Sequence, residues 1–136
     1  MTAATAVIIA ALVVSGAQIE HGWASQYDPG VMAQVIVNRQ NGLAWPGLPL
    51  NLPPADGAIA VACCDDIGQL WWVKPTGGTW GRYLVADCAG AKLRDDGLTA
   101  WEWMQANNVL LEFARETVAA WGWPEQRGIE VEVIRQ

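Results

Sequence analysis

The chain has 136 residues, enough for one domain, and 52% of them are hydrophobic while only 16% are charged. Its net charge of −6 argues against nucleic acid and anionic membrane surfaces as partners, because both attract a basic face. Nine tryptophans are more than a core of this size readily accommodates, since each buried indole N–H needs a hydrogen-bond partner. Some of them are expected at a surface, where flat aromatic faces suit sugar rings or a protein partner.

The first 17 residues include the most apolar segment of the chain. Residues 3–14 are almost wholly hydrophobic, but the run is shorter than the roughly 20 residues that a bilayer span needs. The segment is typical of the centre of a signal peptide, and Ser15, Gly16 and Ala17 supply small residues at a cleavage site. We expect residues 1–17 to be a signal peptide or an N-terminal apolar anchor, with a buried N-terminal helix as the alternative. Export would make a disulfide plausible in residues 18–136 and would limit membrane contact to the N-terminal segment.

Six short strands and two or three short helices are predicted after this segment. The strand-forming runs cover residues 22–27, 58–62, 69–74, 82–87, 109–112 and 128–134. Helical spacing of apolar residues covers 31–39 and 114–121, and a helical turn is expected at 101–105. Residues 43–57 hold four prolines and indicate an irregular loop whose Leu and Trp side chains lie against the domain. Because strands this short need closure to avoid exposed edges, the pattern predicts a mainly β protein built on a small barrel.

An acid ends the fourth predicted strand. The β-prone run from Arg82 to Ala86 leads directly into Asp87, and Cys88 follows. A carboxylate is costly to bury without a partner. Asp87 therefore either binds local backbone N–H groups or faces a cleft and takes part in chemistry.

Several short motifs follow one another in a particular order between residues 22 and 134. They are Gly22-Trp23-Ala24-Ser25-Gln26-Tyr27, Val85-Ala86-Asp87, Leu111-Glu112-Phe113-Ala114, Thr117-Val118-Ala119-Ala120-Trp121-Gly122 and a final Val-x-Val strand. This order resembles the double-psi β-barrel domains of the rare lipoprotein A and expansin type. The resemblance implies a six-stranded double-psi β-barrel with an open groove across one face.

The resemblance also implies a function and its site residues. Members of the family bind or cleave cell-wall polysaccharide, and the lytic transglycosylases among them use an acid at the position of Asp87. A second acid matches Glu112, and a tyrosine near the groove matches Tyr27. The enzymes carry a histidine where this chain has Cys63 and Cys64. We therefore expect a secreted or cell-envelope barrel that binds peptidoglycan, a similar polysaccharide or an envelope protein without turnover.

Two other functions stay open. With Asp87 as general acid and base and Glu112 as its helper, the protein would be a glycan-cleaving enzyme. If Glu112 instead caps the following helix and Asp87 binds backbone amides, the pair has no catalytic role. The protein would then be a binding module or a purely structural interaction module.

The cysteines and tryptophans complete the predicted site. We expect a disulfide between Cys64 and Cys88 that immobilises Asp87, and we expect Cys63 to lie in the core. No metal site or cofactor is expected, because the chain has neither a CxxC pair nor a cluster of histidines. Trp121 is expected to pack the last helix onto the barrel, as is Trp123. Sugar stacking is assigned to Trp71, Trp72, Trp80 and Trp101.

Overall fold

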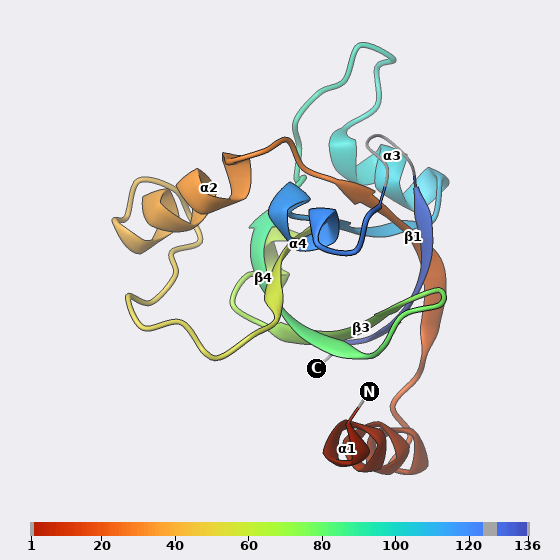
Figure 1. Ribbon diagram of the computed structural model, residues 1–136. Coiled ribbons are helices and arrows are strands. Elements are labelled where there is room, and N and C mark those ends of the chain that lie inside the picture. Colours follow the sequence, from red (N-terminus) through yellow and green to blue (C-terminus); the bar gives the residue numbers. More distant parts are fainter. Residues whose placement is uncertain (1, 124–127, 136) are drawn as a thin grey trace.

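The computed structural model describes residues 2–123 and 128–135, and it contains a closed barrel of six strands (Figure 1). The strands are β1 (Glu20–Gln26), β2 (Gly57–Val61), β3 (Leu70–Pro75), β4 (Gly81–Cys88), β5 (Val109–Phe113) and β6 (Ile129–Ile134). Around the barrel they follow the order β1-β5-β2-β4-β3-β6. Strand β1 pairs parallel with β5 and antiparallel with β6, while β2 pairs parallel with β4. The prediction of a mainly β protein with a small six-stranded barrel is confirmed.

Four α-helices occur in the described part of the chain, and three of them fall within residues 18–136. The helices are α1 (Ala3–Val14), α2 (Val31–Gln40), α3 (Ala100–Ala106) and α4 (Arg115–Ala119), with a 3₁₀ turn η1 (Cys64–Asp66). Helix α3 begins at a capping box in which Thr99 and Glu102 each bind the other's backbone N–H. Helix α4 lies across the opening of the barrel (Figure 1), and its Val118 is fully buried in the core.

Side-chain alternation along the strands produces two separate apolar clusters. The barrel interior is filled by large side chains such as Ile59, Trp71 and Phe113, all at most 1% exposed. On the outer face of β2 and β4, Ala60 belongs to a second cluster that also includes Met32 of α2. Helix α2 therefore packs against the outside of the barrel, next to the end of β4.

Helix α1 covers another part of the outer face. Ile9 packs with Trp72 and Ile134, and Leu12 and Trp80 lie at the margin of this cluster. Apart from Ile9, the residues of α1 are exposed or only partly buried. No helix in the described residues combines the length and apolarity needed to cross a bilayer.

The proline-rich loop follows its prediction only in part. Leu48 is buried, but the side chains of Leu43, Trp45 and Leu50 are 76–80% exposed. The loop is held instead through its backbone, because the Leu48 N–H donates to the Arg39 carbonyl oxygen over 3.1 Å. The side chains of Leu43, Trp45 and Leu50 therefore point away from the domain.

The predicted disulfide between Cys64 and Cys88 is present, with the two sulfurs 2.09 Å apart. It joins the start of η1 to the last residue of β4. The prediction for Cys63 is wrong, because this residue is partly exposed and does not lie in the core. Strand β2 has already ended at Val61, so the alternation that would direct Cys63 inward no longer applies.

Loss of the disulfide should destabilise the fold. Replacing Cys64 and Cys88 by serine is expected to lower the free energy of unfolding by about 3 kcal/mol, because the cross-link spans 24 residues and restricts the unfolded chain. Urea unfolding followed by tryptophan fluorescence measures the change. The control is Cys63→Ser, which removes a free thiol and should leave the midpoint unchanged. Equal midpoints for the double variant and the wild type would contradict the prediction.

Candidate functional site

A row of four residues crosses four neighbouring strands and sets the positions of both predicted acids. Asp87 is in register with Ala60, Ala60 with Glu112, and Glu112 with Ser25. Residues in register point to the same face of a sheet. Ala60 belongs to the outer cluster, so the row lies on the outside of the barrel. The small side chain of Ala60 leaves space between the two acids.

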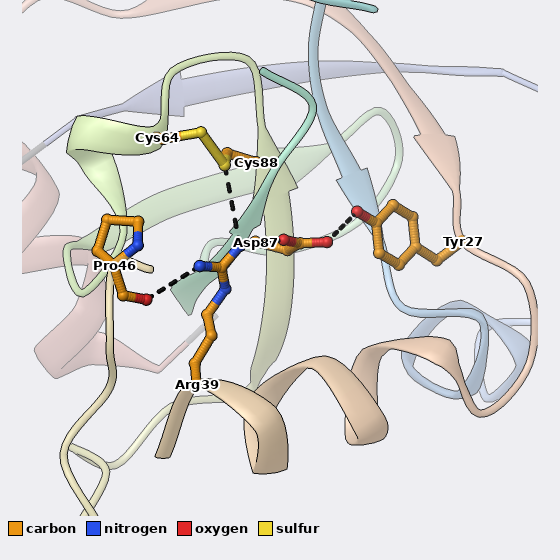
Figure 2. A network of polar contacts seen from close by, with 6 residues as sticks. All are labelled: Tyr27, Arg39, Pro46, Cys64, Asp87 and Cys88. Atoms are coloured by element: carbon orange, nitrogen blue, oxygen red, sulfur yellow. Dashed lines mark hydrogen bonds and ion pairs between the residues drawn. A yellow bond between two sulfur atoms is a disulfide. The ribbon is translucent and has the colours of Figure 1, made fainter. Parts of the chain in front are cut away.

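Asp87 is held by two side chains that come from different elements (Figure 2). The hydroxyl of Tyr27, just beyond β1, donates to Oδ2 over 2.5 Å, and Nη2 of Arg39 donates to Oδ1 over 2.6 Å. The Arg39 side chain is only 6% exposed and the Asp87 side chain 14%. The structure therefore brings Tyr27 and Asp87 together and adds a buried salt bridge to Arg39.

Arg39 is the site residue that the sequence analysis missed. It lies in the last turn of α2, where its Nη1 also donates to the carbonyl oxygen of Pro46 over 2.9 Å. Its Nη2 is 3.9 Å from the sulfur of Cys88 (Figure 2). The sequence does carry a signal for this residue, because spacing from Met32 and Ile36 places Arg39 on the buried stripe of the helix.

Glu112 has an environment different from that of Asp87. Burial raises its pKa above the ordinary value of 4.5, the Ser25 hydroxyl partly opposes this rise, and the charges of Asp87 and Asp28 add to it. Burial and the hydrogen bond to Asp87 also raise the pKa of Tyr27, which keeps the phenol protonated as a donor. Glu112 is thus the acid whose surroundings favour a proton, whereas Asp87 is bound by a cation. The two acids therefore differ in environment.

The particular contacts that the non-catalytic alternative expected for the pair, a helix cap and backbone amides, are not the ones that the structure shows. Glu112 lies within β5, and helix α4 begins at Arg115 after an N-cap residue, Ala114, that forms no side-chain cap. In the described residues, Asp87 is held by the side chains of Tyr27 and Arg39 and not by backbone amides. The same part of the chain contains no group of three His, Cys, Asp or Glu side chains that could hold a metal ion.

A groove of about 1050 Å³ lies near the other end of β4, and we call it the aromatic groove. Five aromatic rings of the described residues line it. Its carboxylates and hydroxyls come from the β3–β4 turn, α4, β6 and the segment before β2. Its main side chains are those of Trp23, Trp80, Tyr83, Trp121, Trp123, Asp56, Glu116, Glu130, Thr76, Thr79 and Thr117. Strand β4 starts at this groove and ends at Asp87, so the two places are separated by the length of one strand.

Of the four tryptophans predicted to stack on sugars, two are buried, one is exposed away from the groove and one lines it. Trp71 is 1% exposed because alternation directs it into the barrel, and Trp72 is 6% exposed because α1 covers it. Neither indole can accept a sugar ring in this arrangement. Trp101 is 43% exposed on α3 but does not line the groove, which leaves Trp80 as the one predicted tryptophan there.

The other groove tryptophans come from residues assigned to packing or to no role. Trp121 and Trp123 do pack as predicted, since the ring of Phe113 lies 5.2 Å and 6.1 Å from theirs. Trp121 also keeps 44% of its surface exposed, and so does Trp23 of β1. These residues lie far apart in the sequence, and only the barrel brings them to one groove.

Removal of the Asp87 charge should destabilise the protein more than removal of its neighbouring hydroxyl. Asp87→Asn leaves the buried Arg39 guanidinium without a counter-charge, and we expect the free energy of unfolding to fall by about 3 kcal/mol. Tyr27→Phe, the matched control, deletes one hydrogen bond and should cost about 1 kcal/mol. Urea unfolding compares the two variants, and an equal or smaller loss for Asp87→Asn would refute this account of the salt bridge.

The raised pKa of Glu112 predicts a pH dependence of stability. Above pH 4.5 the unfolded chain releases the proton while the folded protein retains it, so wild-type stability should fall with rising pH relative to Glu112→Gln. The control is Glu116→Gln, because the Gly30 N–H lowers the pKa of Glu116. Wild type should exceed that variant at neutral pH and lose the advantage in acid. Urea unfolding from pH 3 to 8 measures both trends, and a pH-independent effect of Glu112→Gln would contradict the first.

Comparisons of the chain with family models, with curated proteins and with solved structures gave no match. An assignment of function must therefore start from the geometry of the chain itself. That geometry offers a salt bridge with a neighbouring acid at one end of β4, and an aromatic groove at the other.

Proposed function

We propose that the protein is an exported double-psi β-barrel that binds a polysaccharide chain in the aromatic groove without cleaving it. The observation that carries the proposal is the exposure of tryptophan faces in a groove, with Trp23 and Trp121 each 44% exposed. Large aromatic surfaces that remain accessible in a concave site are costly to leave in water unless a ligand covers them.

The composition of the groove suits a sugar better than a fully apolar ligand. A sugar ring has an apolar face of C–H groups and a polar rim, so it can stack on an indole while its hydroxyls form hydrogen bonds. Thr76, Thr79 and Thr117 supply hydroxyls, and Asp56 and Glu116 supply carboxylate oxygens. The volume is at the upper end of the roughly 300–1,000 Å³ of small-molecule sites. The groove therefore has room for more than one ring.

The position of the acids supports binding without turnover. Asp87, Glu112 and Tyr27 are not among the residues that line the groove. Both carboxylate oxygens of Asp87 already accept hydrogen bonds, one from Tyr27 and one from Arg39. A glycan seated in the groove would meet neither a proton donor nor a base of this pair.

Glycan cleavage at the outer row is the second candidate. It is favoured by the different environments of the two acids, since Glu112 has a raised pKa and Asp87 faces a cation. In this reaction Glu112 would protonate the leaving oxygen. Asp87 would serve as the second carboxylate, two strands away across Ala60.

Export and membership of the double-psi family belong to the proposal as well. A closed six-stranded barrel with mixed pairing is consistent with that family. A disulfide is typical of proteins in oxidising compartments, and Cys64–Cys88 fits a cell-envelope or secreted location.

Mutation of a groove tryptophan should weaken glycan binding. We expect Trp23→Ala to reduce retention on insoluble peptidoglycan, cellulose or chitin at least tenfold, because a central exposed ring contributes strongly to binding. Trp45→Ala is the matched control, since this tryptophan is 80% exposed and lies outside the groove. Co-sedimentation gives the affinity, and the supernatant is assayed for released sugars.

The outcomes separate the two candidates. Retention that Trp23→Ala weakens and Trp45→Ala does not, without soluble products, supports binding in the groove. Soluble products that Glu112→Gln abolishes would establish the second candidate. Absence of retention on all three polymers would overturn the proposal, and an equal loss in both tryptophan variants would remove the groove from it.

A further inference from the structure

A smaller hollow of about 380 Å³ adjoins the aromatic groove along β1 and β6. It is a polar site, lined by His21, Gly22, Trp23, Thr76, Asn108, Glu130, Val131 and Glu132. Trp23, Thr76 and Glu130 line both the hollow and the groove. A linear ligand can therefore pass from one into the other across these three residues.

Among the described residues that line the groove and the hollow, the charged side chains are all carboxylates. They are Asp56, Glu116, Glu130 and Glu132. Asp56 already accepts the Arg82 N–H over 2.7 Å, Glu116 accepts the Gly30 N–H over 2.6 Å, and Glu132 lies 3.8 Å from His21. That leaves Glu130, which is exposed and has no ion-pair partner in the part of the chain described.

Glu130 lies directly beside the exposed ring that both hollows share. Trp23 and Glu130 are opposite each other in the antiparallel pairing of β1 with β6. Such a pair points to one face of the sheet with its Cβ atoms about 5 Å apart. An aromatic face attracts a cation through its quadrupole, and a carboxylate attracts it through its charge. The ring of Trp23 and the carboxylate of Glu130 together suit an ammonium group, at the point where the groove meets the hollow.

We propose that the bound polysaccharide carries free primary amines, and that one ammonium group binds between the ring of Trp23 and the carboxylate of Glu130. This inference rests on the proposed function and specifies its ligand. The sugar rings on one side of this group lie along the aromatic groove, and those on the other side enter the hollow. N-acetylation removes the positive charge, and the carboxylates of this surface repel an anionic glycan.

The test compares two ligands that differ only at the nitrogen. The whole chain is titrated by calorimetry with the hexamer of glucosamine and with the hexamer of N-acetylglucosamine, at low and at high salt. We expect the amine form to bind roughly fivefold tighter at low salt, from one cation–π contact and one exposed ion pair. High salt should reduce this preference, because it screens exposed charges.

Two variants test whether the preference for the amine hexamer comes from Glu130. Glu130→Gln should bind the acetylated hexamer as wild type does, and it should lose the part of the preference for the amine form that high salt screens, because only the cation–π contact with Trp23 remains. Asp95→Asn changes the net charge equally on an exposed loop outside both hollows and should keep the wild-type preference. Equal affinities in wild type would overturn the inference while leaving glycan binding intact, and so would a preference that is undiminished in Glu130→Gln. If neither hexamer nor any insoluble polymer binds, the proposed function fails together with the inference.

Discussion

The salt bridge between Arg39 and Asp87 is the interaction on which the organisation of this end of the molecule depends. A guanidinium that is only 6% exposed needs a counter-charge close by, and Asp87 provides it at 2.6 Å. The same arginine binds the proline-rich loop through Pro46, and the same aspartate binds Tyr27 after β1. One ion pair thus joins α2, the loop and the ends of two strands. The disulfide at Cys88 fixes the backbone immediately beside it.

This arrangement explains why an acid at the end of a strand is not by itself a sign of catalysis. Asp87 uses both oxygens to hold neighbouring elements, whereas the accessible aromatic surface lies at the start of the same strand. Strand β4 in this way separates the salt bridge from the aromatic groove. Glu112 belongs neither to the salt bridge nor to the groove. Burial raises its pKa, and its neighbour in the same row, Asp87, is part of the salt bridge. Catalysis by this row would therefore depend on contacts that also stabilise the fold.

The sequence was sufficient for the strands, the closure of the barrel and the disulfide, since these follow from alternation, strand length and the small number of cysteines. It was insufficient for the groove. Trp71 and Trp72 are adjacent in an alternating strand, yet one fills the interior and the other lies under α1, so neither meets solvent. Trp23 and Trp121 become neighbours in one groove only after the barrel has closed. Arg39 could have been found from its place on the buried stripe of α2, but its partner could not, because 48 residues separate them.

The pairing of β1 has a consequence for how the protein is made. This strand ends at Gln26, while its neighbours β5 and β6 begin at Val109 and Ile129. Its backbone N–H and C=O groups therefore have no strand to bind until synthesis has passed β5 and β6. Contacts this distant in sequence also slow folding, because a long loop must be closed before they form. Until those two strands have been made, the barrel cannot close, and its first strand remains available to any other partner with a free strand edge.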